Sequence, residues 1–304
     1  MSDIQSGRNS VTFHSMGYKI AAHLYTPDDF DPAKSYPAVV FTSPGTSVKE
    51  MSGAVYGAEF SKRGYVFLVF DRIGFGESEG PLQQPIAIHF GTEALRDAIS
   101  FLRSHSFVDR NKVFGLGLCV GSQQMVQVAV TDKRLKAIAT GSGMLDSFVF
   151  MRNFMTPEQR HDYYLAANEA RQAYFETGEM ATFDYFPKGD ASDQPEHSTA
   201  RKGQEYYNGD VPPHPRYSSV IPANSAEYEW GNHAVSFGPY LETPYMGIVG
   251  EFADLAPLTK AFFDVCTDPK EYVIIPGKDH VDLYQDAASE VCDAATGFFE
   301  KHSA

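Results

Sequence analysis

Short apolar runs recur along the chain and predict the strands of a buried sheet. Such runs are typical of parallel strands covered on both faces, whereas a half-exposed strand alternates apolar and polar residues. Helix-compatible stretches separate the runs; in His89–His105, for example, apolar residues fall on one helical face. The predicted buried strands are Pro37–Thr42, Tyr65–Phe70, Lys112–Leu116, Leu135–Thr140, Pro244–Gly250 and Glu271–Ile275.

Two alternating segments precede these runs. Val11–Ser15 and Tyr18–Tyr25 flank Met16-Gly17 and predict a β-hairpin. Further helices are expected at about Ser52–Arg63 and Asp286–Lys301. Strands that alternate with helices specify a doubly wound α/β sheet with right-handed crossovers.

The alternation of strands and helices stops between about Gly143 and Tyr240. This stretch has no strong strand pattern, and it interrupts the sheet between two of its strands. We therefore predict an α/β core formed by residues 1–142 and 241–304, and an inserted helical lid at 143–240 with loop-rich parts such as Asp210–Pro215. The alternative is a second packing layer with an aromatic core. The aromatic residues of the insertion include Tyr163, Tyr164, Tyr174, Phe175, Tyr185, Phe186, Tyr206, Tyr207, Tyr228 and Trp230.

Composition and charge narrow the function classes. Of the 304 residues, 43% are hydrophobic and 21% charged, as in an ordinary globular protein, and the formal net charge is −14. An acidic surface repels phosphate backbones and anionic lipid, so we expect no nucleic-acid or membrane partner. Residues 1–10 lack the apolar segment of a secretory signal, and no run of about 18 apolar residues could span a bilayer. We expect a cytoplasmic enzyme with a small-molecule substrate, and leave a homodimer open.

Gly117-Leu118-Cys119-Val120-Gly121 carries the clearest candidate chemistry. It follows a predicted strand and precedes the helix-compatible run Ser122–Val130, which is the nucleophile-elbow pattern with Cys in place of Ser. Glycines are needed because side chains two residues either side of the nucleophile would collide in so sharp a turn. The amide of Val120 and the helix N-terminus would favour a thiolate and an oxyanion. The alternative is a small buried core cysteine.

His280 is the candidate general base. It lies in a loop just after the predicted strand Glu271–Ile275, at the carboxyl end of the sheet from which a base can reach the elbow. The order nucleophile, acid, histidine is also the order expected of this fold. The alternative is a surface loop histidine.

The residue that orients the imidazole is less well specified by the pattern. Asp254 follows the strand Pro244–Gly250 and is our choice, but the spacing contains one residue more than usual, so Glu251 stays a competitor. Asp279 and Asp282 flank the histidine and are expected to point away. With a Cys nucleophile the acid matters less, since a thiolate–imidazolium pair can form near neutral pH.

An oxyanion hole requires a second amide, for which the turn Ser43-Pro44-Gly45-Thr46 is well placed. We assign the amide of Thr46, with Ser47 as the fallback; the alternative is an ordinary Pro-Gly turn. The loop Asp71–Gly80 is rich in glycine but lacks the spacing and the lysine of a nucleotide site. The three cysteines have no metal-like spacing, and we expect neither a cofactor nor a metal.

Three motifs together resemble the dienelactone-hydrolase-like branch of the α/β-hydrolases, and more narrowly the group that includes fungal polyketide transferases and bacterial hydrolases. They are Phe70–Gly80, the elbow Gly117–Gly121 and the loop Gly277–Tyr284. The resemblance implies an eight-stranded sheet and a nucleophilic role for Cys119. The chain departs from the family in carrying Ser122 where many relatives have Gly, and in its longer aromatic insertion, which makes simple dienelactone hydrolysis a poor expectation.

Together these features predict a Cys-His-Asp hydrolase that acts on an ester, thioester or related carbonyl through a covalent intermediate. A small apolar, polyketide-like substrate would suit an aromatic lid. Three alternatives stay open: acyl transfer at the same site as in a polyketide transferase, cleavage of a carbon–carbon bond by a hydrolase or lyase, and a ligand-binding protein that has kept the fold.

Overall fold

The computed structural model describes residues 4–209, 215–229 and 233–303. Trp230 and all but the last residue of the predicted loop at 210–215 lie outside these ranges.

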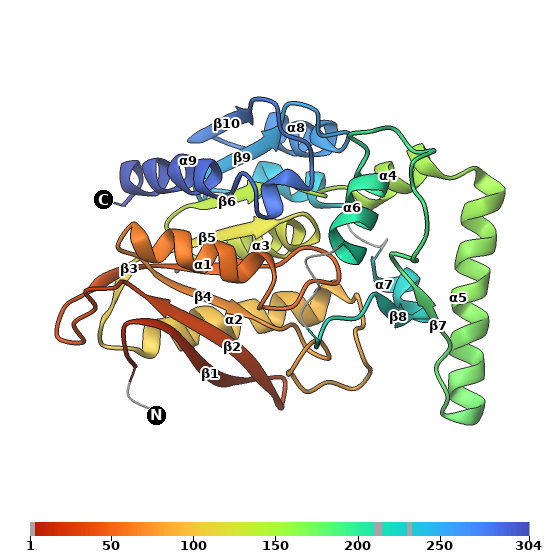
Figure 1. The fold of residues 1–304 in the computed structure, drawn as a ribbon, viewed down its shortest axis with the longest axis horizontal. Coiled ribbons are helices and arrows are strands. Elements are labelled where there is room, and N and C mark those ends of the chain that lie inside the picture. Colours follow the sequence, from red (N-terminus) through yellow and green to blue (C-terminus); the bar gives the residue numbers. More distant parts are fainter. Residues whose placement is uncertain (1–3, 210–214, 230–232, 304) are drawn as a thin grey trace.

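One mixed sheet of eight strands runs through the molecule (Figure 1) in the order β1-β2-β4-β3-β5-β6-β9-β10. The hairpin β1–β2 and the pair β2–β4 are antiparallel, and the other neighbours are parallel. The predicted eight-stranded, mostly parallel sheet is therefore confirmed. The strands are β1 (Gly7–Ser15), β2 (Tyr18–Thr26), β3 (Tyr36–Thr42), β4 (Val66–Phe70), β5 (Val108–Leu118), β6 (Ile138–Gly141), β9 (Tyr245–Gly250) and β10 (Lys270–Ile275).

Helices cover both faces of the sheet, which is why β3, β4, β6 and β9 read as continuous apolar runs. Helices α1 and α9 contribute to one buried cluster, and α2, α3 and α8 to the other. Helix α8 and the short 3-10 turn η3 were not among the predicted elements. The bounds are α1 (Ser52–Lys62), α2 (Ile88–Ser104), α3 (Val120–Thr131), α8 (Ala256–Val265), η3 (Asp282–Tyr284) and α9 (Ala288–Lys301).

The stretch predicted as an insertion contains four helices, two 3-10 turns and a small antiparallel pair of strands in the part of the chain that is described. The sequence shows no strong strand pattern there, and each of these strands has only three residues, too few to leave one. The elements are α4 (Ser147–Phe154), α5 (Pro157–Thr177), β7 (Thr182–Asp184), α6 (Thr199–Asn208), β8 (Val220–Pro222), η1 (Ala223–Ser225), α7 (Ala226–Glu229) and η2 (Ala234–Tyr240).

Helix α5 lies at the edge of the molecule (Figure 1) and buries only Ala167 and Ala170. Its start is well specified, because Thr156 and Gln159 form a capping box and Pro157 occupies the first turn. The turn η2 packs instead against α3 and α8 of the core. The boundaries of the lid therefore stay a prediction.

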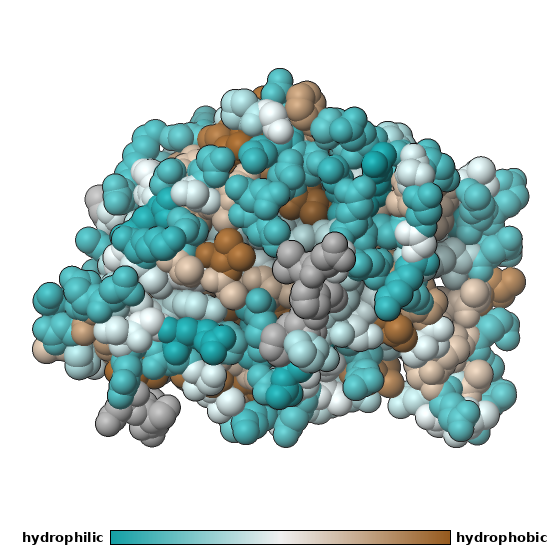
Figure 2. Space-filling view, viewed as in Figure 1, coloured by the Kyte–Doolittle hydropathy of each residue, from teal (hydrophilic) through white to brown (hydrophobic). Residues whose placement is uncertain are grey.

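The surface seen in Figure 2 is largely polar, in keeping with the acidic composition. Within the described residues, no helix combines the length and apolarity needed to cross a bilayer.

Candidate active site

Cys119 lies at a sharp turn between β5 and α3. Its backbone angles, φ 50° and ψ −118°, belong to a region that costs most L-residues on the order of 1–3 kcal/mol. The flanking glycines are required by contact: a Cβ on Gly121 would lie 2.2 Å from the Thr42 carbonyl oxygen, and one on Gly117 would lie 2.7 Å from the Gly121 carbonyl oxygen. The collision predicted from the sequence is therefore present at both positions.

Two hydroxyls hold this turn in place. Ser122 Oγ donates to the Gly117 carbonyl at 2.9 Å, and Thr42 Oγ1 donates to the Gly121 carbonyl at 2.8 Å. Ser122 thus ties the first turn of α3 to the end of β5. These bonds help to fix the Cys119 side chain relative to the strand ends.

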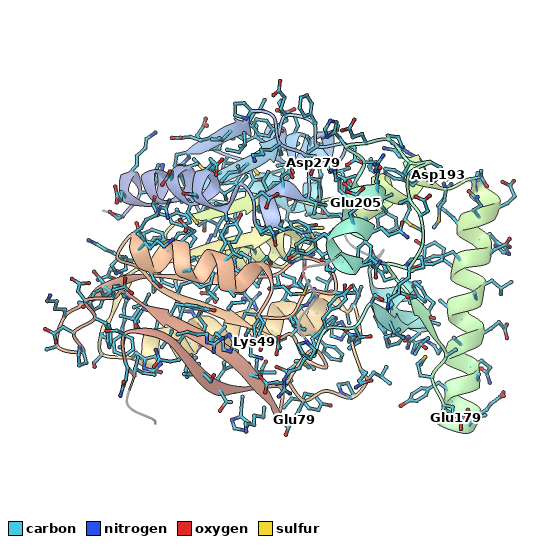
Figure 3. The ribbon with its side chains drawn as sticks, in the orientation of Figure 1. Lys49, Glu79, Glu179, Asp193, Glu205 and Asp279 are labelled. Carbon is cyan, nitrogen blue, oxygen red and sulfur yellow. The ribbon has the colours of Figure 1, made fainter. Side chains whose placement is uncertain are left out.

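The loop that carries His280 is fixed by its neighbouring aspartates. Asp279 Oδ1 accepts from the amides of Val281 and Asp282 at 2.9 and 3.0 Å, and Asp282 Oδ2 accepts from the Asp279 amide at 2.9 Å. Both carboxylates are therefore engaged with the loop backbone rather than with the imidazole. Figure 3 shows Asp279 close to α6, from which Lys202 approaches its other oxygen at 3.9 Å.

His280 is fully buried, and its Nε2 lies 3.0 Å from the Tyr284 hydroxyl. Burial lowers its pKa to about 4, although the charge of Asp254 acts in the opposite direction. The free imidazole is therefore neutral near pH 7, the protonation state that a general base requires. Among the described residues, Nδ1 has no hydrogen-bond partner.

The two candidate acids differ in their contacts. Glu251 is exposed, and its Oε2 accepts from the Gly277 amide at 2.8 Å, so it serves the loop. Asp254 is also exposed and accepts from Thr199 at the start of α6, from the amide at 2.9 Å and from the hydroxyl. Of the two, Asp254 is the one whose charge acts on His280.

The candidate oxyanion amides differ in whether they already donate a hydrogen bond within the protein. The Ser47 amide donates to the Pro44 carbonyl at 3.1 Å, which closes the predicted turn and occupies the fallback donor. The Thr46 and Ser47 hydroxyls contact two tyrosines of the insertion, Tyr217 at 3.2 Å and Tyr207 at 3.0 Å. Val120 is the first residue of α3, where an amide has no acceptor within its own helix.

A cavity of about 340 Å³ borders some of these groups, but neither His280 nor Thr46 is among its described lining residues. Cys119 is only 7% exposed, but it borders this cavity together with Gly45, Val120, Asp254 and Tyr284. Within the described part of the chain, no lysine or arginine lines this cavity. The apolar lining includes Met144, Phe150, Tyr163, Phe186, Tyr207 and Leu255.

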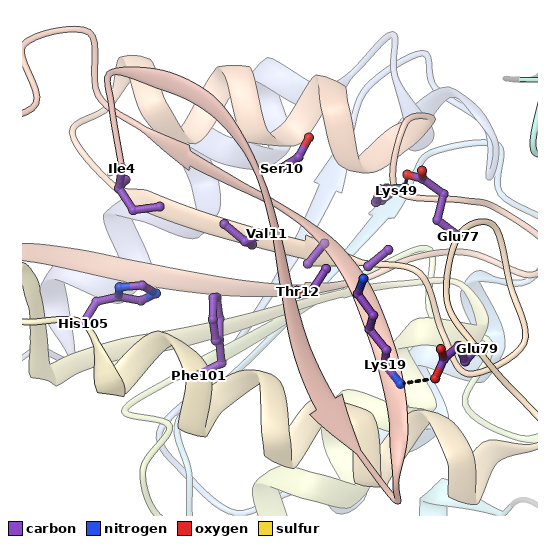
Figure 4. A pocket seen from close by; sticks show the side chains of 12 residues that line it. Ile4, Ser10, Val11, Thr12, Lys19, Lys49, Glu77, Glu79, Phe101 and His105 are labelled. Atoms are coloured by element: carbon purple, nitrogen blue, oxygen red, sulfur yellow. Dashed lines mark hydrogen bonds and ion pairs between the residues drawn. The ribbon is translucent and has the colours of Figure 1, made fainter. Parts of the chain in front are cut away.

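The glycine-rich loop Asp71–Gly80 has a structural partner that sequence reasoning missed. Lys49 is 1% exposed, and its Nζ lies within 2.8 Å of carboxylate oxygens of Glu50, Asp71 and Glu77. Lys49 also borders a second cavity, of about 590 Å³, beside the β1–β2 hairpin (Figure 4). None of the predicted site residues lines that cavity.

Tyr284, Tyr207 and Thr199 were also missed as site residues. Tyr284 lies in the motif Gly277–Tyr284, four positions after His280, and that spacing within a short turn is a signal that could have identified it. Tyr207 and Thr199 are far from the motifs in sequence and left no comparable signal.

Comparisons with known proteins agree with this architecture. The protein YcjY of Escherichia coli is 28% identical over 305 residues, which cover 96% of this chain and 98% of YcjY. The crystal structure of PA2218 from Pseudomonas aeruginosa is 26% identical, with a TM-score of 0.86 over 97% of this chain and 93% of that chain.

A fungal enzyme is a more distant relative. The polyketide transferase grgF of a Penicillium species is 23% identical over 81% of each chain. Its crystal structure, described as an α/β hydrolase, has a TM-score of 0.81 at 20% identity and covers 97% of this chain and 99% of that chain.

A family model also matches. The model of the X-Pro dipeptidyl-peptidase (S15) family matches residues 16–218, which include the elbow but neither Asp254 nor His280. This match spans about two thirds of the 304 residues. The chain therefore belongs to the X-Pro dipeptidyl-peptidase (S15) family of α/β-hydrolase-fold enzymes.

Proposed function

We propose that the protein is a cysteine-dependent acyl hydrolase that forms a covalent thioester between Cys119 and an apolar acyl group. The observation that carries this proposal is the strained cysteine at the strand–helix turn, which borders an apolar cavity. Tyr284 lines the same cavity, and its hydroxyl contacts His280 Nε2. A soft sulfur nucleophile suits thioester and activated-ester substrates.

The reaction starts from a neutral thiol and a neutral imidazole. His280 is the base that receives the Cys119 proton while the sulfur attacks the acyl carbonyl. The amides of Val120 and Thr46 stabilise the oxyanion, because Val120 borders the cavity at the start of α3 and the alternative donor, the Ser47 amide, is already engaged with the Pro44 carbonyl. His280 then returns the proton to the leaving group, and Asp254 stabilises the transient imidazolium through its charge.

The lining of the cavity favours an uncharged acyl group. Aromatic and aliphatic side chains dominate, and among the described lining residues the charged group is the carboxylate of Asp254. A carboxylate on the acyl chain would meet no counter-charge there and would be repelled. We therefore expect medium-sized apolar acyl groups as substrates.

Acyl transfer is the second candidate, because Cys119 is nearly sealed from solvent and the relative grgF is a polyketide transferase. A site that limits water can pass the acyl group to an alcohol or amine instead. Product analysis with added alcohols separates the two: an ester product indicates transfer, and free acid alone indicates hydrolysis.

The test is intact-protein and peptide mass spectrometry after incubation with acyl thioesters, activated esters and β-diketones. We expect the acyl mass on Cys119 in the wild type and in Cys266→Ala, and none on the Cys119→Ala variant. Cys266 is a matched control, since burial raises its pKa to about 12 and it lies away from the cavity. Full turnover by Cys119→Ala would refute a covalent role for this residue.

A further inference from the structure

The Tyr284 hydroxyl lies between the sulfur of Cys119 and the ring of His280. It is 3.0 Å from His280 Nε2 and also hydrogen-bonds the Cys119 side chain. The side chain is 3% exposed and borders the same cavity. The two groups that must exchange a proton are thus joined through a third group that can both donate and accept.

Local structure fixes this hydroxyl. Tyr284 ends the turn η3, and its amide donates to the Val281 carbonyl at 2.8 Å. The ring of Tyr206 packs edge-on against it, with 5.3 Å between ring centroids and an interplanar angle of 80°. The neighbouring Leu283 carbonyl accepts from the Tyr56 hydroxyl at 2.5 Å. Because these contacts hold both the ring and the backbone, the hydroxyl has little freedom to leave its two partners.

A proton can pass from Cys119 through Tyr284 to His280 only if the hydrogen bonds between them have the right donors and acceptors. A relay requires the tautomer of neutral His280 that carries its proton on Nδ1, toward which the negative charge of Asp254 acts. It also requires the phenol to donate to the lone pair on Nε2 and its oxygen to accept from the thiol. In that arrangement each hydrogen points from sulfur toward the imidazole.

We propose that Tyr284 is a catalytic residue that relays the Cys119 proton to His280. This inference rests on the proposed function. The S–H bond breaks as a new O–H bond forms on Tyr284, and the original O–H bond breaks as an N–H bond forms on Nε2. The electron pair stays on sulfur and attacks the acyl carbonyl, while the phenol is regenerated without net change.

The relay does not require a free tyrosinate. Burial raises the pKa of Tyr284 well above its usual value, with the nearby Cys119 adding to the effect. A concerted shift of two protons avoids placing a negative charge on the buried oxygen. The same property prevents Tyr284 from acting as a nucleophile itself.

The experiment compares Tyr284→Phe with Tyr206→Phe, using the single-turnover rate at which Cys119 is acylated. Tyr206 is the matched control: it packs in the same aromatic group, but its hydroxyl bonds the Ser52 backbone and it does not line the cavity. We expect Tyr284→Phe to lower the acylation rate about 100-fold, the low end for loss of acid–base catalysis, without a matching change in KM. Tyr206→Phe should stay close to the wild type.

A solvent-isotope measurement separates a relay from a structural hydrogen bond. The acylation rate is measured in mixtures of H2O and D2O. For the wild type, the plot of rate against deuterium fraction should be curved, because two protons move. For Tyr284→Phe it should be closer to a straight line, because only one proton moves. Identical curves, or an unchanged rate in a folded Tyr284→Phe, would overturn the relay.

A second replacement covers the case in which Tyr284→Phe does not fold. Difluorotyrosine at position 284 keeps the ring and hydroxyl but makes the phenol more acidic, so a relay predicts a changed acylation rate and a structural bond does not. Failure of the proposed function looks different from either result: the wild type itself would then form no acyl-Cys119.

Discussion

At the scale of single residues, the state of His280 decides how the cysteine is activated. Cysteine proteases of the ion-pair type keep a thiolate because a neighbouring imidazolium stabilises it. Here burial lowers the pKa of His280 to about 4, so the imidazole is neutral over most of the working range and offers no such charge. The proposed mechanism therefore deprotonates Cys119 during attack instead of relying on a thiolate already stabilised by an imidazolium.

This predicts the pH dependence of Cys119 alkylation by iodoacetamide. Without an ion pair, the rate should rise steadily from about pH 6 to about pH 9, with no plateau on the acid side. Stopped alkylation followed by mass spectrometry measures it. A Cys266→Ala, Cys292→Ala background confines labelling to Cys119, and a plateau below about pH 6 would indicate an ion pair instead.

The residues found from the sequence were those whose role is local. Cys119 is identified by glycines two positions away on either side, which a Cβ would force into contact with neighbouring backbone. His280 is identified by its place after a strand. Thr199 and Tyr207 could not be found in this way, because their contacts with Asp254 and Ser47 join segments 55 and 160 residues apart.

At the scale of elements, helix α6 is joined to the candidate acid. The first residue of α6, Thr199, donates two hydrogen bonds to the Asp254 carboxylate, while His280 Nδ1 lacks a partner among the described residues. If Asp254 orients His280 as proposed, helix α6 and the imidazole compete for the same carboxylate. This contact would then couple α6 to the acid–base chemistry.

Changing Thr199 should therefore shift the pKa of His280. Thr199→Val removes the hydroxyl donor, lets the carboxylate approach Nδ1, and should move the acid limb of the kcat/KM profile to higher pH. Asp254→Asn removes the charge that raises the pKa and should move the acid limb to lower pH.

The control is Thr156→Val, which removes the N-cap of α5 and costs about 1 kcal/mol of stability without touching the site. It should leave the acid limb where it is in the wild type. Equal limbs in all three variants would contradict the coupling.

Predictions for whole elements succeeded where the pattern was strong. The buried strands and the core helices α1, α2, α3 and α9 follow from apolar runs and helical periodicity. The pair β7–β8 was missed because three-residue strands carry no period and form only where the surrounding chain holds them. The capping box of Thr156 and Gln159 was a visible signal for the start of α5.

At the scale of the whole molecule, the parallel strands explain why distant residues share one site. The loops after β3, β5, β9 and β10 all leave the same edge of the sheet and carry Thr46, Cys119, Asp254 and His280. Neighbouring loops are also bonded to each other, as the Phe252 amide donates to the Lys278 carbonyl at 2.8 Å. Sheet topology thus brings the loops together, and contacts between them set the finer geometry.

The stability of this edge depends on the buried charge of Lys49, which joins the loops after β3 and β4. Its ammonium contacts three carboxylates, of which Asp71 is fully buried. Lys49→Met leaves these charges without their cation and should lower the free energy of unfolding by about 3–5 kcal/mol in urea titrations.

The control is Lys62→Met, which breaks an exposed pair with Glu59 and should lower the free energy of unfolding by only about 0–1 kcal/mol. Lowering the pH protonates the uncompensated carboxylates and removes their charge. The difference in free energy of unfolding between Lys49→Met and the wild type should therefore become smaller as the pH is lowered. A difference independent of pH would mean that Lys49 contributes through packing rather than charge.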